Sequence, residues 1–517
     1  MNPRQQMLRS SVTVAFFNLL GGLSGILVET SIAANLGLSL RSDTFYVAYT
    51  IPYIISNLLT ATSQFSLVPF FASLESAKDE NQLWRGFSYV TNILFLGLGA
   101  IAVVGAVTAP WIIHAIAPGF SHQHVEVAAQ LSRWLFLIII PAGIGEVLRS
   151  FLLSRHYFAI STASGFIRNV ASILVILLGF HRYGAQSIFL GYLAGYLLQL
   201  VVLGSQILVS SRPRYSMTLT GSGKSFTNLR GAGTAQLAGA LGWQGVVVVE
   251  RIIASFLPAG TLTALNYGFR ILGTLAELLG GSVGTAALPS LSRAVAAGDH
   301  DKEHKTFRDT LEISLLLLSP MVVYCLTLSH NIIRLVFQRG NFTAEATSLM
   351  ASVFFYYSLS LIFFALIRLL SFYLFARLEP GIYFRLSLFQ YVVNIVFDLI
   401  YVGVFHLGAK GIPLGFLTSL VVACAVAYWR NLASFQLVVD RTLAAFTGKA
   451  VLASGLAALV MVGLRAAYGN PPTNPANFVY LCVMCSTGGL VFFVTMALSG
   501  AIRMADFSIL WRRPGNA

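Results

Sequence analysis

The amino-acid sequence predicts an all-α membrane protein with about fourteen transmembrane helices. Apolar stretches of about 20 residues or more follow one another through nearly all of the 517 residues. Hydrophobic residues make up 56% of the chain and charged residues only 10%, against about 25% charged residues in soluble domains. Because lipid offers no hydrogen-bonding partner to a bare backbone, each stretch that crosses the bilayer is expected to be a helix.

The expected spans follow in chain order, with short polar connectors between them. The first group covers residues 10–36, 44–72, 88–117, 127–153, 159–180 and 184–209. The longest polar connector, residues 210–230, contains Arg212, Arg214, Lys224 and Arg230 among Ser, Thr and Gly, and we interpret it as a linker. The second group covers residues 232–257, 263–291, 309–329, 347–376, 380–405 and 411–437, and two further spans cover 446–468 and 476–502.

The two groups of spans are related by an internal repeat. Leu67-Val68-Pro69, which precedes a charged loop, has its counterpart in Ala287-Leu288-Pro289, 220 residues further along the chain. Arg155, at the end of the fourth span, has its counterpart in Arg377, 222 residues further along. Two lobes of the same orientation are typical of transporters that rock around a central cavity, although a non-transporting scaffold would show the same repeat.

The repeat predicts four segments. Residues 1–210 form an N-terminal lobe of six spans, and residues 211–231 form a cytoplasmic linker. Residues 232–440 form a C-terminal lobe of six spans, and residues 441–517 hold the last two spans and a cytoplasmic tail.

Basic residues are distributed unevenly among the connectors. On this topology, most of the 33 Lys and Arg residues fall in the two termini and in the connectors on the same side of the membrane. The positive-inside rule then places both termini in the cytoplasm, which requires an even number of spans. The net charge of +14 is spread over short loops, so we expect no nucleic-acid partner, which is the other common reason for a basic chain.

Several short motifs resemble those of one transporter family. They include Ser42-Asp43 with Phe45, Ala117-Pro118-Gly119-Phe120, Ala254-Ser255-Phe256-Leu257 with Gly260, Gly284-Thr285 with Leu288-Pro289, and Phe337-Gln338 with Gly340 and Phe342-Thr343-Ala344. Their order and spacing across residues 40 to 440 are similar to those of the lipid II flippases called MurJ or MviN. That family belongs to the superfamily of multidrug, oligosaccharidyl-lipid and polysaccharide exporters. The resemblance implies export of a polyprenyl-pyrophosphate-linked saccharide across the bacterial inner membrane.

The chain also departs from the family pattern. The resemblance implies cavity-facing arginines in the first and second spans, but the corresponding residues 22–29 and 52–57 contain none. The family's arginine of the eighth span is present as Arg270, while its usual acidic neighbour is replaced by Phe269.

Arginines inside the expected spans are the candidate substrate-binding residues. A charge at mid-membrane is costly, so it is a functional candidate by default. Arginine suits a pyrophosphate, because its planar and permanently charged fork binds phosphate oxygens. The candidates are Arg270, Arg251, Arg149, Arg168 and Arg368. We expect Arg149 and Arg251 to replace the missing arginines, because a single cation does not compensate the negative charges of a pyrophosphate in a low-dielectric cavity.

Acidic residues in or beside the spans are the candidates for gating or ion coupling. They are Glu29, Asp43, Glu250 and Glu277. Ion pairing within the protein is the alternative interpretation of these charges. Glu146 and Arg149 lie three residues apart on one expected helix, and Arg270 and Glu277 lie two turns apart on the same face of another.

The sequence predicts a transporter rather than an enzyme. It contains no nucleotide-binding loop, metal-ligand cluster or nucleophile triad, so we expect no cofactor and no metal, and transport driven by an ion gradient, the membrane potential or substrate consumption. The first hypothesis is a lipid II flippase that works by alternating access. The alternatives are a flippase for an exopolysaccharide or O-antigen unit, a multispan glycosyltransferase or polymerase, and a drug antiporter. Expected partners are the lipid-linked saccharide, membrane lipids and the cell-wall synthesis machinery.

Overall fold

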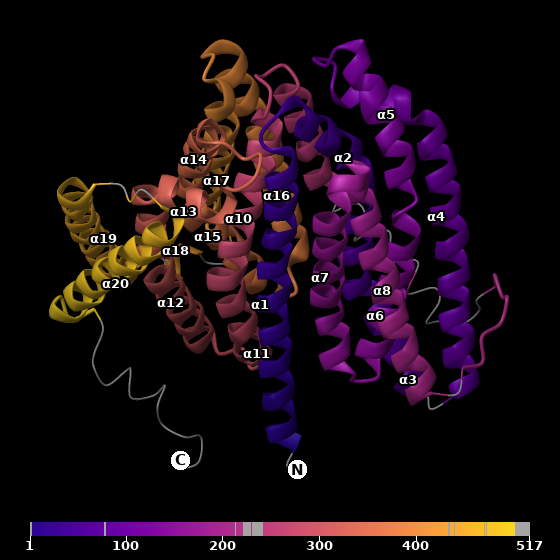
Figure 1. Ribbon diagram of the computed structural model, residues 1–517. Coiled ribbons are helices and arrows are strands. Elements are labelled where there is room, and N and C mark those ends of the chain that lie inside the picture. The colour runs from indigo at the N-terminus through magenta and orange to yellow at the C-terminus, as the bar shows by residue number, and fades with distance from the viewer. Residues whose placement is uncertain are drawn as a thin grey trace. The chain divides into compact units, whose positions relative to one another are not determined.

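The computed structural model describes residues 3–76, 79–211, 213–220, 229, 241–432, 435–438, 440–469, 471 and 473–501. All regular structure in these ranges is helical, which confirms the predicted fold class (Figure 1). The chain packs as two compact units. The first unit consists of Met1–Thr263 with Arg339–Thr343, and the second of Ala264–Gln338 with Ala344–Ala517.

The first unit is built from long helices that pack in antiparallel neighbours. Residues 241–254 are also helical, and the remaining helices are α1 (Pro3–Leu36), α2 (Leu40–Thr62), the π-helix η1 (Ser63–Leu67), α3 (Val68–Ser76), α4 (Glu80–Ile116), α5 (His122–Phe136), α6 (Ile139–Ser154), α7 (Phe158–Tyr183) and α8 (Gln186–Ser210). Gly195 allows α7 and α8 to pack closely, because a Cβ atom there would lie 2.6 Å from the carbonyl oxygen of Arg168.

Aromatic side chains form the core near the start of α4. The rings of Phe87 and Phe151 are 4.8 Å apart, and Trp84 packs against both. Phe71, from α3, also contacts Phe151. Asp79 begins α4 by accepting hydrogen bonds from the amides of Asn81 and Gln82, which satisfies free N–H groups of the first turn.

The second unit continues the chain from Ala264. Its helices are α10 (Thr261–Ala276, whose first turn belongs to the first unit), the π-helix η2 (Glu277–Gly281), α11 (Ser282–Ala296), α12 (His300–Thr327), α13 (Ser329–Phe337), α14 (Ala344–Leu359), α15 (Leu361–Ala376), α16 (Pro380–Leu399), the π-helix η3 (Ile400–Val404), the short 3-10 helix η4 (Gly408–Lys410), α17 (Gly411–Trp429), α18 (Phe435–Val438), α19 (Arg441–Tyr468) and α20 (Asn474–Leu498).

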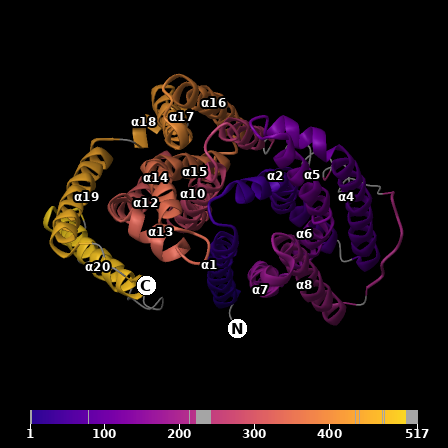
Figure 2. The ribbon, with the colours of Figure 1, turned by 45° about the horizontal axis from the view of Figure 1, so that its top comes forward.

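The last two long helices attach to the second unit through α12. Helices α19 and α20 form an antiparallel pair, and α19 packs along α12 (Figure 2). Ala450, Ala453 and Ala457 are buried in this contact, and such small residues allow helices to approach closely. At the start of α12, Glu303 is buried and accepts hydrogen bonds from Tyr373 (2.8 Å) and Arg377 (3.0 Å) of the α15 region.

Within the described residues, eleven helices are long and apolar enough to cross a membrane, or twelve when the bent pair α14 and α15 counts as one span. The axes of α14 and α15 differ by 46°. The predicted span 44–72 is divided by η1 into α2 and α3, and only residues 241–254 of the predicted span 232–257 are described as a helix. The count of fourteen spans and the repeat-based lobe boundaries therefore stay predictions.

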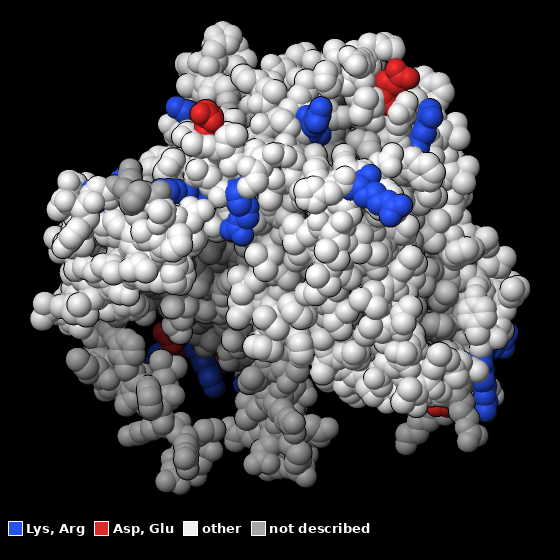
Figure 3. Space-filling model, in the orientation of Figure 1, with Lys and Arg blue, Asp and Glu red and all other residues white. Residues whose placement is uncertain are grey.

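The first unit carries an uncharged belt of the kind that faces lipid. At the right of Figure 3, charged side chains lie above and below this belt. Large apolar side chains of α4, such as Val103, Val107 and Trp111, are exposed. A chain that presents this much apolar surface between two charged zones fits a bilayer rather than water.

Part of the predicted linker is fixed to α4. Residues 213–220 follow α8 as an extended segment along the outer side of α4 (Figures 1 and 2). Asn92 donates hydrogen bonds to the carbonyl oxygens of Ser216 (3.1 Å) and Thr218 (2.9 Å), and the amide of Ser216 donates to the Ser88 hydroxyl. Arg212, Lys224 and Arg230 of the linker lie outside the described residues.

Replacing Asn92 with Ala should release this segment from α4. Asn92 makes three hydrogen bonds to the segment, because its side-chain oxygen also accepts from the Tyr215 hydroxyl. Three such bonds contribute roughly 1.5–4 kcal/mol, so we expect trypsin to cleave after the exposed Arg214 at least about tenfold faster in the variant. The measurement is limited proteolysis of the purified protein in lipid nanodiscs. Thr108→Ala on the same helix is the control, because the Thr108 hydroxyl bonds only to its own helix at Val104. Equal cleavage rates in the Asn92 variant and the wild type would contradict the packing described here.

Candidate functional site

A buried carboxylate joins two helix N-termini in the first unit. Asp43 lies in the first turn of α2 and is only 3% exposed. It accepts hydrogen bonds from the backbone amides of Gly260 (2.7 Å) and Thr263 (2.8 Å) and from the Thr263 hydroxyl (2.6 Å). These amides belong to the start of α10, where free N–H groups and the helix dipole favour an anion. Asp43 therefore holds the start of α10 against α2.

Close contacts to backbone carbonyl oxygens join two loops at the same end of the unit. The amide of Asn341 donates to the carbonyl oxygen of Ala34 (2.7 Å), and the Asn341 side chain donates to that of Asn35 (2.6 Å). Gly37 and Gly340 have φ values of +65° and +58°, and a Cβ atom on either would lie within 2.5 Å of a backbone oxygen. Only glycine permits both this conformation and this approach.

A third loop joins this contact region. The amide of Gly119 donates to the Ser255 hydroxyl (3.1 Å), and a Cβ atom at Gly119 would lie 2.4 Å from the Ser255 carbonyl oxygen. We call the contact region formed by residues 34–43, 117–120, 255–263 and 339–343 the gate cluster. It contains Asp43, one of the four acidic residues predicted to act in gating or coupling.

Arg251 lies beside the gate cluster. Its guanidinium donates a hydrogen bond to the carbonyl oxygen of Leu262 (3.4 Å) and interacts electrostatically with Asp43. Its neighbour Glu250 lies in the same helical stretch, residues 241–254. Arg251 therefore contacts the gate cluster through Leu262. Its contact with substrate stays a prediction.

Arg168 lies among tyrosines that the sequence did not mark as functional. Its guanidinium carbon is 4.9 Å from the centre of the Tyr196 ring, in a cation–π contact. Tyr49 stacks on Tyr192 with ring centres 5.1 Å apart and also packs against Tyr53. These tyrosines belong to α2 and α8. One of them, Tyr53, lies within residues 52–57, where the family resemblance implies an arginine.

Two polar contacts attach α1 to this region. The Asn169 side chain, next to Arg168, donates to the Ser24 hydroxyl (2.9 Å) and to the carbonyl oxygen of Gly21 (3.2 Å). The buried Tyr46 hydroxyl donates to the carboxylate of Glu29. Glu29, the second predicted gating or coupling acid, therefore links α1 to α2.

Arg149 is largely occupied by contacts within the protein. Its side chain donates to Glu146 at 2.7 Å and to the Ser63 hydroxyl at 3.2 Å, and Ser63 donates to the same carboxylate. The side chains of Arg149 and Glu146 are 16% and 12% exposed. The local ion pair that the sequence offered as an alternative is therefore present, and it is anchored to the first residue of η1.

In the second unit, Arg270 and Glu277 lie on the span that contains α10, η2 and α11, and Arg368 lies on α15. Arg270 is exposed on α10. Glu277 begins η2 and forms an ion pair with Arg368 of α15. The seven-residue spacing between Arg270 and Glu277 on one span did not identify this partner, because α15 supplies it from elsewhere in the chain.

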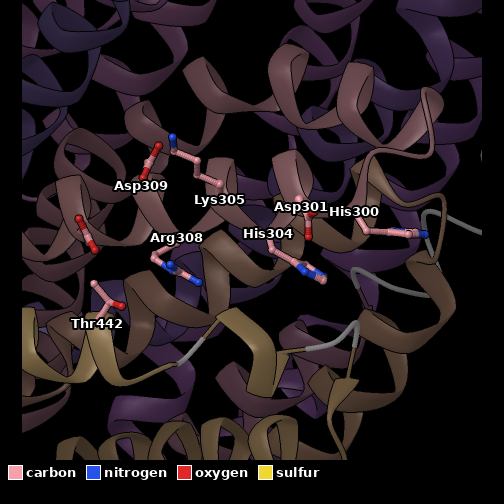
Figure 4. Close-up of a pocket in the computed structure, with 8 residues that line it drawn as sticks. His300, Asp301, His304, Lys305, Arg308, Asp309 and Thr442 are labelled. Atoms are coloured by element: carbon pink, nitrogen blue, oxygen red, sulfur yellow. The ribbon is translucent and has the colours of Figure 1, made fainter.

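A polar pocket of about 750 Å³ opens at the start of α12 (Figure 4). Its lining combines basic and acidic side chains and holds none of the predicted site residues. The lining residues are His300, Asp301, His304, Lys305, Arg308, Asp309, Glu312 and Thr442. Arg308 pairs with Asp440 at 2.9 Å, and hydrogen bonds from the amide of Leu443 and other groups hold the pKa of Asp440 below its ordinary value. The balance of charges makes this pocket a poor site for a pyrophosphate.

One further acid is fully buried in a span. Asp398 on α16 is 0% exposed and accepts a hydrogen bond from Asn394 (2.8 Å) one turn earlier. Gly415 on α17 makes room for it, because a Cβ atom there would lie 2.0 Å from the Asp398 carboxylate. The enclosure of Asp398 becomes visible only when α16 and α17 are paired.

Comparison with known proteins decides the family. The sequence model of the family described as "Lipid II flippase MurJ" matches residues 32–472. The chain belongs to the MurJ lipid II flippase family. Four of the family-like motifs, around residues 42–45, 117–120, 254–260 and 337–344, contribute residues to the gate cluster. The backbone contacts between these segments explain why the motifs contain Gly119, Gly260 and Gly340.

Two relatives have comparable lengths. A probable lipid II flippase MurJ of Buchnera aphidicola subsp. Baizongia pistaciae is 24% identical over 438 residues, which cover 82% of each chain. The lipid II flippase MurJ of Burkholderia cenocepacia is 25% identical over 390 residues, which cover 73% of each chain.

Solved structures share the fold. A lipid II flippase MurJ in an inward closed conformation aligns with a TM-score of 0.77 and 20% identity over 95% of this chain and 98% of that one. A multidrug resistance MATE family transporter of the MOP superfamily, in an inward-facing conformation, aligns with a TM-score of 0.69 and 14% identity over 82% of this chain and 95% of that one. The chain therefore has the MurJ-like and MATE-like fold expected from its sequence.

Replacing Gly340 with Ala should prevent full closure of the gate cluster. The new Cβ atom would lie 2.3 Å from the carbonyl oxygen of Ala34, a backbone atom that cannot rotate away. Closure can be measured as the yield of a disulfide between Asn35→Cys and Asn341→Cys, which we expect to fall severalfold.

Gly298→Ala is the matched control, because Gly298 has a similar φ of +67° but no heavy atom within 4 Å of the place that a Cβ atom would take. Both variants carry the cost of about 1 kcal/mol for a side chain in this conformation, and only Gly340→Ala adds the steric contact. A similar fall in disulfide yield in both variants would assign the effect to backbone strain alone.

Proposed function

We propose that this chain is a flippase that moves lipid II from the cytoplasmic to the outer leaflet by alternating access. The observation that carries the proposal is the match of the MurJ family model over residues 32–472, which includes every segment of the gate cluster. Closing one end of the protein by short backbone contacts suits alternating access, since such contacts form and break without rearranging a side-chain core. The family consists of transporters, so we expect no catalytic centre.

Headgroup recognition is assigned to two regions, one in each unit. In the second unit, Arg270 and Arg368 are the proposed ligands of the pyrophosphate, because guanidinium groups bind phosphate oxygens through paired hydrogen bonds. In the first unit, Arg168 with Tyr49 and Tyr196 offers a cation beside aromatic rings. Rings of this kind pack against the apolar faces of sugars, so this region is proposed to contact the saccharide.

A flippase for another lipid-linked glycan is the second candidate. The observation that favours it is the absence of arginine from residues 22–29 and 52–57, in spans where the family resemblance implies cavity-facing cations. The tyrosines of α2 and α8 occupy part of this region instead. A change from cations to aromatic rings would fit a different headgroup.

The protein is a multi-pass membrane protein of this family, and we infer that it resides in the bacterial inner membrane with both termini in the cytoplasm. The distribution of Lys and Arg between the connectors supports this orientation. In that orientation the gate cluster faces the periplasm. Contact with the cell-wall synthesis machinery is proposed because lipid II is made and consumed by such enzymes.

Transport is proposed to depend on an ion gradient or on the membrane potential. Asp398 supports this proposal, because a carboxylate that is 0% exposed inside a span is costly to keep charged and is therefore a candidate to carry a proton or a cation. Asn394 beside it provides a further polar group.

The experiment that tests the function is depletion of the protein in its native host. Loss of wall integrity with accumulation of lipid II on the cytoplasmic side is the expected result. Loss of a surface polysaccharide with an intact wall would instead support the second candidate. Restoration by a plasmid-borne copy is the control for effects on neighbouring genes.

Replacing Arg270 with Ala should weaken substrate binding by about ten- to hundredfold, since a hydrogen bond to a charged group contributes roughly 1.5–3 kcal/mol. Arg270→Lys should restore only part of the affinity, because the ammonium lacks the planar fork. Binding of lipid II to the purified protein is the measurement.

Arg293→Ala is the control for a lost positive charge on the same span, since Arg293 is bonded to the carbonyl oxygen of Pro289 in its own helix. Unchanged affinity in Arg270→Ala would show that Arg270 has a structural role.

A further inference from the structure

Arg368, one of the proposed phosphate ligands, already holds an anion in this structure. Its guanidinium forms an ion pair with the carboxylate of Glu277. The side chains of Arg368 and Glu277 are 42% and 55% exposed, so the pair is accessible from outside the packed core. A carboxylate and a phosphate use the same guanidinium N–H groups, which means that an anionic headgroup must compete with Glu277 for Arg368.

Glycines place the Glu277 carboxylate. Glu277 begins η2, and a Cβ atom at Gly281, the last residue of η2, would lie 2.7 Å from the Glu277 Oε2 atom. The absence of that atom leaves the space in which the carboxylate lies. At Gly280, a Cβ atom would lie 3.0 Å from the Cβ atom of Ala365, so η2 is packed closely on α15, the helix that carries Arg368. π-helical turns of this kind recur at functional sites.

The pair formed by Arg149 and Glu146 in the first unit provides the contrast. Those side chains are 16% and 12% exposed, and the Ser63 hydroxyl bonds to both. Separating them would leave two buried charges without compensation, which is strongly unfavourable. A half-exposed pair that faces a water-filled transport cavity is worth far less, because the water of the cavity screens it. Glu277 can therefore leave Arg368 at small cost, whereas Glu146 cannot leave Arg149.

We propose that Glu277 is an internal competitor for the substrate: its carboxylate occupies Arg368 until an anionic headgroup displaces it. This inference rests on the proposed function, since it takes the headgroup to be a pyrophosphate. Displacement frees the first residue of η2 from α15, so that headgroup binding loosens the contact between the eighth span and its neighbour. When the headgroup departs, the carboxylate returns to Arg368 and prevents rebinding. Glu277 thus lowers affinity and favours release.

Binding of a short prenyl pyrophosphate to the full chain in nanodiscs tests the competition. Glu277→Gln should tighten the Kd by about two- to fivefold, the range expected for removing one half-exposed ion pair. Gly281→Ala should act in the same direction without changing the net charge, because the new Cβ atom displaces the carboxylate from its position over η2. Glu379→Gln is the matched charge control, since Glu379 is also a partly exposed acid paired with an arginine, Arg377, outside the proposed site.

The double variant Glu277→Gln with Arg368→Gln separates competition from general repulsion. If Glu277 acts by occupying Arg368, removing its charge should have no further effect once Arg368 is gone, and the double variant should bind like Arg368→Gln alone. An equal tightening in the Arg368→Gln background would overturn the proposal, because it would show repulsion acting at a distance. Unchanged Kd values in both Glu277→Gln and Gly281→Ala would also overturn it.

Transport kinetics provide a readout that a purely structural role would not give. Glu277→Gln should lower the KM and also lower the kcat, because binding is tighter while release loses the returning carboxylate. A variant that loses kcat with an unchanged KM and Kd would indicate a structural defect and contradict the inference. Failure of the wild-type protein to bind any prenyl pyrophosphate would count against the proposed function itself, and this outcome is distinguishable from a wild type that binds but is indifferent to Glu277.

Discussion

Within a bilayer, a polar or charged group has no water to bond, so each one must find its partner inside the protein. This constraint accounts for most of the polar contacts in the spans. Hydroxyl groups of Thr50, Ser150 and Ser319, for example, donate to carbonyl oxygens of their own helices. Some ionisable side chains pair within their own helix, as Glu146 and Arg149 do, while others, such as Glu277 and Arg368, find their partners on another helix. The placement of those partners determines which charges are fixed and which are available for a substrate.

The gate cluster follows from the same constraint at a helix end. The first turn of α10 has amide groups without helical acceptors, and Asp43 of α2 accepts from one of them, that of Thr263, and from the amide of Gly260 directly before the helix. A carboxylate buried in this way needs hydrogen bonds, and the α10 amides need an acceptor, so each stabilises the other. Beside Asp43, glycines lie directly against backbone carbonyl oxygens. These contacts let the segments pack closely and bring in no side-chain polar group that would need a further partner.

The arginines differ in how completely the protein satisfies them. Arg149 is enclosed with Glu146 and Ser63, while Arg168 lies over a tyrosine ring and Arg368 holds a half-exposed carboxylate. Weakly held arginines are useful to a transporter, because a site that binds an anion too tightly does not release it. A carboxylate that exchanges with the headgroup keeps the arginine compensated in both states. The energy difference between bound and unbound protein then stays small, as repeated turnover requires.

The sequence by itself determined the class of the protein. The apolar stretches are a local property, and the requirement for helices in lipid follows from backbone chemistry alone, so the all-α membrane fold could be predicted without knowledge of packing. The family resemblance could also be recognised from the sequence, because the motif residues are specific and their order and spacing are regular. The sequence even offered the Glu146–Arg149 pair, since three residues on one helix fix the distance.

Only the tertiary structure decided the partners between helices. Glu277 has an arginine seven residues earlier on its own span, yet it pairs with Arg368, from a helix more than eighty positions later in the chain. The tyrosines around Arg168 come from α2 and α8, and nothing in either segment alone marks them as neighbours. Asp43 and Thr263 are 220 positions apart and become bonded only when α2 and α10 meet. Such contacts depend on how the helices pack, on the rotation of each helix about its axis and on interruptions such as the π-helix η2. These features result from the packing of many side chains together rather than from any local sequence pattern.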